Sequence, residues 1–390
     1  MAASVTIGSA PKGSTSQAGR SRHCSSGLIP RNRLKWVPPS ARLAHEYCYF
    51  LHDACVRMLA EYEKARAHHV RFKFRDADEV EEFERLANEV GSIEAMKRLG
   101  RLDKARRVAI STITMGMVSD CLHHIYEALR CMERRKVVVA FNLLRKPLAD
   151  SLVYLAWMLG DEDGFYEAFT KKSPAGLAPK IVGNRRQAIL QAALEKTALK
   201  DVIQSDWLHA VLFKDDFERG LYKILQRAVH LITVSREAVK TESENFNFIF
   251  KNYADDDSYD GLYEVLPPVL LFLAHVIEGL YDRMKAMDPG ARTAFQVRTI
   301  TSMFLLSDDS NRINEARKTL AKVSQILVCP NCKKPLVLTQ HNMARLLMRE
   351  SFRCTGCRTV TPFPFSYIKS LGTYHIALDQ LVIHNELHPQ

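Results

Sequence analysis

The sequence predicts a mainly α fold, a multi-helix bundle that carries a small β module near its carboxyl end. Apolar residues recur at spacings of three and four over most of residues 41–321, the period of helices with one buried face. Two Cys-x-x-Cys pairs follow in a stretch that lacks this period. With 390 residues, of which 47% are apolar and 25% charged, the chain has the composition of a globular protein with a sizeable core.

Residues 1–40 are expected to be a disordered basic tail. They are rich in Ser, Gly, Pro and Arg and show no apolar period, and residues 1–42 hold seven Lys/Arg and no Asp/Glu. The same composition also fits an organelle transit peptide, so that alternative stays open. The helical body is then assigned to residues 41–321, and a C-terminal helix to residues 366–390, beginning after Gly372.

The helical body divides at polar, Gly and Pro positions. Asp76 or Asp78 is the expected N-cap of a charged helix, and Pro147 should kink another. A strongly apolar helix is expected to carry Pro267 and Pro268 in its first turn. The expected helices cover about 41–69, 78–97, 110–132, 136–159, 162–170, 174–198, 217–241, 266–287, 291–306 and 309–326.

The cysteine pairs indicate a metal site in residues 322–365. Their pattern is C-x2-C-x21-C-x2-C, and each two-residue spacing lets a tight turn present two sulfurs to one ion. Zn²⁺ suits four thiolates, and a site filled by four protein ligands has no open position for chemistry. The predicted ligands are Cys329, Cys332, Cys354 and Cys357. This stretch resembles a zinc ribbon, with strands expected at "PLVLT" and "ESFRC".

Basic and aromatic residues around the cysteines suggest a partner. Residues 322–358 hold seven Lys/Arg and one Glu. Cations bind phosphates, and Phe352, Phe363 and Phe365 would offer stacking surfaces. We therefore expect the module and the basic tail to contact nucleic acid or a protein, the alternative being that the module only fastens the carboxyl end. The cations in question are Lys333, Lys334, Arg345, Arg349, Arg353 and Arg358.

The five remaining cysteines are scattered, and burial as small apolar side chains is the expected role of Cys48, Cys55, Cys121 and Cys131. Together with Cys24 they form no disulfide framework, which indicates a reducing, cytoplasmic compartment. The most apolar stretch contains two prolines and reaches only about a dozen clean positions, so no membrane span is predicted.

The sequence offers only weak candidates for a catalytic site. Asp120 with His123, His124 with Glu127, and His275 with Glu278 have the spacing of bundle metal ligands, but the order is reversed on the second helix. Lys146 and Asp150 are expected to pair along one helix, and Arg145 is a candidate ligand-binding residue. No Arg precedes a His with the gap of four to six residues that HEPN ribonucleases need.

Two stretches, "EALRCMERRKVVVAFNLLRKPLADSLVYLAWMLGDEDGFYEAF" and "RAVHLITVSREAVKTESENFNFIF", resemble uncharacterised bacterial helical proteins near HEPN-like and abortive-infection bundles. The resemblance covers about 100–290 and implies a role in bacterial stress or phage defence. The leading hypothesis is a non-catalytic, zinc-binding regulatory or binding protein. The alternative is a nuclease-like hydrolase with its site around His123, Arg145 or His230.

Overall fold

A computed structural model describes residues 25–171, 174–232, 241, 243, 256–307 and 309–364. Within these ranges the chain is mainly helical, with one two-stranded antiparallel sheet near the carboxyl end, which confirms the predicted fold class. The α-helices are α1 (Arg42–Lys64), α2 (Ala77–Val90), α3 (Ser92–Arg98), α4 (Leu102–Met132), α5 (Val137–Arg145), α6 (Leu152–Gly160), α7 (Glu162–Lys171), α8 (Pro179–Gly183), α9 (Arg186–Leu194), α10 (Ser205–Phe213), α11 (Leu221–Val229), α12 (Asp257–Met284), α13 (Pro289–Phe304), α14 (Ser310–Ile326) and α15 (Gln340–Arg349).

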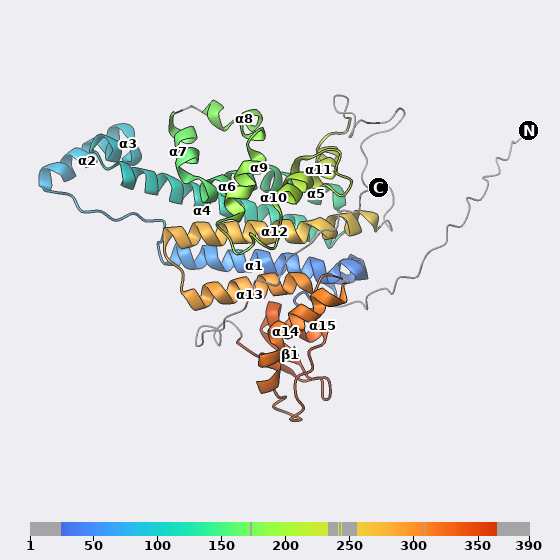
Figure 1. Ribbon diagram of the computed structural model, residues 1–390. Coiled ribbons are helices and arrows are strands. Elements are labelled where there is room, and N and C mark those ends of the chain that lie inside the picture. Colours follow the sequence, from blue (N-terminus) through green and yellow to red (C-terminus); the bar gives the residue numbers. More distant parts are fainter. Residues whose placement is uncertain are drawn as a thin grey trace, which may run out of the picture.

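The centre of the body is a layer of long helices. Figure 1 shows α13, α1 and α12 side by side with nearly parallel axes, and of these three helices α4 packs mainly against α1. Large side chains such as Tyr47 and Phe272 are fully buried between them. By length and composition α12 could cross a membrane, but 83% of its most apolar stretch is buried inside the molecule, as in a core helix. The shorter helices α5–α11 cover the α4–α12 side of this layer.

Helix ends follow local chemistry. The Asp76 side chain accepts a hydrogen bond from the backbone N–H of Glu79 at 2.8 Å, so it is the N-cap of α2. Gly91 has a φ of +84° and separates α2 from α3, where one helix was expected. The prediction for α12 was wrong at its start, because the helix begins at Asp257 and the Pro267–Pro268 pair lies inside it.

The predicted kink at Pro147 takes the form of a wider turn. Residues Lys146–Ser151 are π-helical and join α5 to α6. Proline has no N–H to donate to the preceding turn, and a π turn accommodates that loss without ending the helix. Leu144, Leu148 and Leu152 are all fully buried, so the apolar stripe continues across the bulge.

Two further predicted helices differ from those observed. The stretch 174–198 is divided into a 3₁₀ turn (Pro174–Leu177), α8 and α9. In the stretch 217–241, the apolar spacing predicts an inner face with Leu221, Leu225, Val229 and Ile232. Helix α11 ends at Val229, and Val229 and Ile232 are 41% and 56% exposed. Helix α10 was not expected. The C-terminal helix predicted for 366–390 lies outside the described residues.

The predicted tail of residues 1–40 is wrong over residues 25–40. Short 3₁₀ turns form at Arg33–Trp36 and Pro39–Ala41, and Ile29, Leu34 and Val37 are at most 4% exposed. Arg33 also donates hydrogen bonds to the nearly buried carboxylate of Glu133. This segment is therefore part of the body, because burial of its apolar side chains offsets the entropy cost of ordering it.

Candidate metal centre

Two tight turns with matching backbone geometry present the four cysteines. In the first turn, the N–H of Cys329 donates to the carbonyl of Lys334 at 2.8 Å, and Val328 bridges Pro335. In the second, the N–H of Cys354 donates to the carbonyl of Thr359 at 2.9 Å. The residue after the second cysteine of each turn is left-handed, with φ of 58° at Lys333 and 62° at Arg358. The sequence thus builds the same turn twice.

The sulfurs converge on one point. Sγ of Cys329 lies 3.5 Å from that of Cys357, and Sγ of Cys332 lies 3.4 Å from that of Cys354. All four sulfurs lie within 4.8 Å of one another. Zn–S bonds of about 2.3 Å in a tetrahedron place sulfurs ~3.8 Å apart, whereas a disulfide needs about 2.05 Å. The cluster therefore has the donor set and the spacing of a four-thiolate metal site, and its cysteines are not disulfide-bonded.

Hydrogen bonds favour the thiolate forms of Cys354 and Cys357 that a metal requires. The backbone N–H of Gly356 points at Sγ of Cys354 from 3.3 Å, and the Thr359 hydroxyl lies 3.2 Å from Sγ of Cys357. Hydrogen bonding by the Thr359 side chain and backbone lowers the pKa of Cys357 to about 5. Cys329 and Cys354 are buried and Cys357 is exposed, so the site lies at the surface of the module.

A helix between the cysteine pairs was missed by the sequence analysis. After Thr339, which caps it, α15 occupies residues expected to connect strands, and "PLVLT" contributes only the bridge at Pro335. Strands β1 (Ser351–Arg353) and β2 (Val360–Pro362) form the sheet. The buried Asn342 joins the two halves, because its amide donates to the carbonyl of Val337 at 3.0 Å and accepts from the N–H of Arg353 at 3.0 Å.

Several residues expected to face a partner make hydrogen bonds or packing contacts within the chain instead. Arg345 is 7% exposed and donates to the carbonyl of Ser26, and Arg349 donates to the carbonyl of Gly27. Phe352 and Phe363 are 1% and 7% exposed, so the prediction that they offer stacking surfaces was wrong. Phe365 lies outside the described residues. Packing of α15 against α13 explains these differences, since it turns this side of the module inward (Figure 1).

Arg298 of α13 fastens α15 to the body. It is 6% exposed, and its guanidinium donates to the carbonyls of Leu347 and Met348 at 2.6 and 3.4 Å. These carbonyls end α15, where the helix has acceptors without internal partners and a partial negative charge. The guanidinium of Arg298 also lies over the ring of Phe50, and burial lowers the pKa of Arg298 to about 10. A buried cation therefore joins the metal module to the helical core.

The bundle metal site is not supported. Among the residues that the structure describes, only the four cysteines form a group of three or more His, Cys, Asp or Glu able to share an ion. His275 and Glu278 are fully buried and contact Thr299 and Arg292 of α13, whereas His123 is exposed on α4. The prediction that Lys146 pairs with Asp150 was also wrong.

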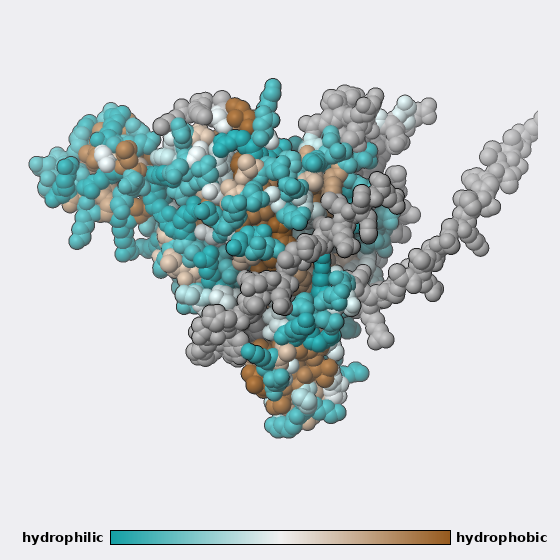
Figure 2. Space-filling view, in the orientation of Figure 1, coloured by the Kyte–Doolittle hydropathy of each residue, from teal (hydrophilic) through white to brown (hydrophobic). Residues whose placement is uncertain are grey.

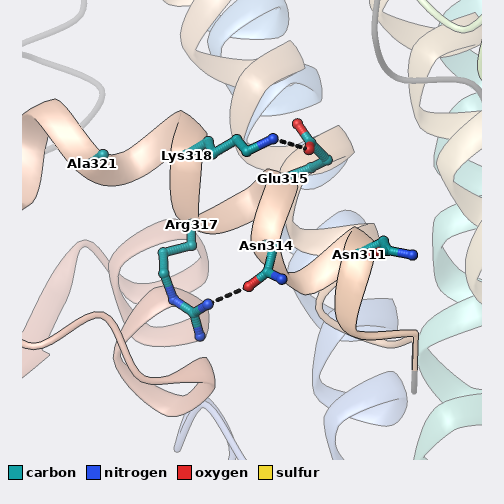
Figure 3. A pocket seen from close by; sticks show the side chains of 6 residues that line it. All are labelled: Asn311, Asn314, Glu315, Arg317, Lys318 and Ala321. Carbon is teal, nitrogen blue, oxygen red and sulfur yellow. Dashed lines mark hydrogen bonds and ion pairs between the residues drawn. The ribbon is translucent and has the colours of Figure 1, made fainter.

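Lys146 instead pairs with Asp120 of α4 at 2.8 Å, which joins two helices rather than two turns of one helix. Arg145 is partly buried, and its Nε has no hydrogen-bond partner. His230 follows α11 at an exposed position. A surface hollow of about 430 Å³ lies instead along α14, lined by Asn311, Asn314, Glu315, Arg317, Lys318 and Ala321 (Figure 3).

This hollow is a helix surface rather than an enclosed site. All of its lining residues come from one helix, and two of its cations are held by neighbours on that helix, Lys318 by Glu315 at 2.6 Å and Arg317 by Asn314 (Figure 3). Comparisons of the chain with protein-family models, with curated proteins and with solved structures find no match. The metal module is therefore the feature on which a functional assignment has to be based.

Proposed function

We propose that this protein is a non-catalytic binding protein with a structural Zn²⁺ at Cys329, Cys332, Cys354 and Cys357. The convergence of four sulfurs within 4.8 Å carries the proposal. Four thiolates complete a tetrahedron, so neither water nor substrate has a ligand position, in contrast to catalytic zinc sites with three protein ligands. The free thiols of Cys48, Cys55 and Cys121, all buried, support a reducing compartment such as the cytoplasm.

The proposed partner is nucleic acid, contacted by the outer side of the module. Lys333, Lys334 and Arg358 are exposed in the two cysteine turns, and Arg317 and Lys318 are exposed on the neighbouring α14. Cations so grouped bind phosphates whatever the base sequence. The buried positions of Phe352 and Phe363 argue against base stacking. We therefore expect binding that depends on charge and has little sequence preference.

Titration of fluorescent RNA and duplex DNA with the full chain, at several salt concentrations, tests this proposal. Replacing Lys333, Lys334 and Arg358 by Glu should weaken binding and reduce the salt slope for duplex DNA by about 3, since each phosphate contact contributes ~0.9. The control replaces three exposed cations of the body, Lys64, Arg71 and Lys73. Equal losses in both variants, or no binding by the native chain, would contradict the proposal, and the second result would point to a protein partner.

The nuclease-like alternative has no geometric support of its own. His123 is exposed on α4 and His230 is exposed just after α11. The described residues bring no second group of metal ligands together. Incubation of the full chain with RNA and DNA, with and without divalent cations, would reveal hydrolysis. Activity that is abolished by His123→Ala or His230→Ala and unaffected by loss of zinc would favour the hydrolase instead.

A further inference from the structure

The backbone of residues 25–29 passes between α1 and α15 and is bound on both sides. On the α1 side, the fully buried carboxylate of Glu46 accepts hydrogen bonds from the N–H of Ser26 at 2.6 Å and of Ile29 at 3.1 Å. A carboxylate without solvent requires such donors. This turn therefore supplies hydrogen-bond donors that the buried Glu46 carboxylate requires.

On the α15 side, three residues spaced by one helical turn hold three successive carbonyls. His341 Nδ1 lies 2.5 Å from the carbonyl of Ser25, Arg345 donates to that of Ser26 at 3.1 Å, and Arg349 donates to that of Gly27. Positions four apart share one face of a helix. One face of α15 thus binds the backbone carbonyls of the turn rather than its side chains.

The turn is shaped for this contact at Gly27. Its φ is +69°, which favours glycine, and a Cβ added there would lie 2.9 Å from Nη1 of Arg345. Gly100 makes a useful comparison, because its φ is +70° and an added Cβ would meet nothing within 4 Å. Both glycines therefore have a left-handed backbone, but only at Gly27 would an added Cβ meet a neighbouring side chain.

The same face of α15 is connected to the metal ligands. Nη2 of Arg345 donates to the Ser351 hydroxyl at 3.2 Å, and Ser351 begins the strand that leads into Cys354. Asn342 holds the N–H of Arg353, next to Cys354, and the carbonyl of Val337, beyond the first cysteine turn. Both cysteine turns therefore contribute, together with Arg298, to how α15 is held.

We propose that residues 25–29, Glu46 and the His341–Arg345–Arg349 face form a metal-dependent clasp on the N-terminal segment. Without the ion, the two cysteine turns lose their common ligand and the module loses the free energy that metal binding contributes to its folding. The α15 face then no longer holds the three carbonyls, and the segment that follows the basic residues 1–24 is released. The clasp rests on metal binding at the cysteines and not on nucleic-acid contact.

Thermodynamic coupling must act in both directions. In the full chain, Gly27→Ala should weaken the clasp and lower the zinc affinity about tenfold, measured by equilibrium competition with a metallochromic chelator, whereas Gly100→Ala should leave the affinity unchanged. Equal zinc affinity in native and Gly27→Ala protein would overturn the proposal. If Gly27→Ala fails to fold, Arg349→Ala removes one contact at an exposed position and should lower the zinc affinity severalfold, and an unchanged affinity would again overturn it.

Hydrogen exchange measures the reverse direction. Peptides covering residues 25–29 should exchange at least tenfold faster after zinc removal, and this increase should exceed the one in peptides from α12, which exchange only through unfolding of the whole core. Unchanged exchange in 25–29 would contradict the clasp. Zinc stoichiometry is measured first, by elemental analysis of the purified chain. A chain without zinc would refute the metal site itself, whereas a zinc-loaded chain with uncoupled exchange would refute only the clasp.

Discussion

At the residue scale, Lys333 and Arg358 adopt a conformation that suits neither side chain. Their φ values of 58° and 62° place a Cβ too close to the following carbonyl oxygen, at a cost of ~1–2 kcal/mol each. Glycine removes this cost but loses more entropy on folding, by about 0.4–1 kcal/mol. The geometry of the metal site thus determines the backbone at these positions against local preference.

Replacement of Lys333 by Gly should therefore raise the unfolding free energy of the zinc-loaded chain by about 0.5–1 kcal/mol. Denaturant unfolding in the presence of zinc measures this value. Lys333→Ala is the control, because it removes the charge and keeps the Cβ that causes the strain. If both variants gain equally, charge repulsion is the cause and the strain argument is wrong.

A second residue-scale prediction concerns His275, whose ring is fully buried against Thr299. Burial, and then the charge of Arg292, lowers its pKa to about 3. In the unfolded chain the ring takes up a proton near pH 6.5, and in the folded chain only near pH 3, so stability is lost as pH falls between these values. The loss is about 1.4 kcal/mol per pH unit.

We expect His275→Gln to remove this part of the pH dependence. Between about pH 7 and about pH 5, the unfolding free energy of the native chain should fall by ~2 kcal/mol more than that of His275→Gln. Urea unfolding at several pH values measures it. Burial raises the pKa of the neighbouring Glu278, so its protonation stabilises the fold as pH falls, but this effect and that of the cysteines are common to both proteins. The exposed His123→Gln is the control, and a native-like pH dependence in His275→Gln would contradict the prediction.

At the element scale, the sequence predicts the elements that depend on local pattern. Helix α4 shows the apolar spacing of three and four that predicts a helix over 110–132, and Cys121, Ile125 and Leu129 are at most 2% exposed. The cysteine ligands are predictable for the same reason: each pair lies within four consecutive residues, and the chemistry of thiolates fixes what they can bind.

The elements that were missed depend on distant contacts. Residues 25–29 are bound by Glu46 and by Arg345, the latter 319 positions away from Ser26, and no local period marks such pairing. Leu28, Ile29 and Leu34 were a signal in the sequence, but their spacing fits neither a helix nor a strand. For α15, the 21 residues between the cysteine pairs suggested strands, although the Thr339 cap and the run of Met343, Leu346 and Leu347 fit a helix.

The attachment of α15 gives an element-scale prediction. Arg298→Met should leave the carbonyls of Leu347 and Met348 without a donor and cost about 1–3 kcal/mol. Hydrogen exchange of Gln340–Arg349 should increase while that of α12 stays the same. Arg298→Lys, which can satisfy one carbonyl, should fall between native and Met, and Lys318→Met on α14 is the exposed control. Equal protection of α15 in Arg298→Met and the native chain would show that Arg298 is not the attachment.

At the scale of the whole molecule, the module and the helical body share one core. The buried side chains of α15 and β1, among them Leu346, Leu347 and Phe352, belong to the same contiguous apolar cluster as those of α1 and α12. Outside this contact the module presents Ile326, Val328, Val337 and Val360 at 48–65% exposure, and Figure 2 shows apolar residues on its surface. Because one core joins the two parts, metal binding at the module should stabilise the whole chain.

This gives a quantitative expectation for zinc. A ligand that binds only the folded chain stabilises it by RT ln(1 + [L]/Kd), so each tenfold rise in free zinc above Kd should add about 1.4 kcal/mol to the unfolding free energy. Denaturant unfolding in zinc buffers, followed by helical circular dichroism, measures this dependence across the whole body. Cys332→Ser should abolish it, and Cys131→Ser, outside the module, should retain it. If native protein shows the dependence only in probes within residues 322–364, the module unfolds by itself, and the shared core does not transmit metal binding to the body.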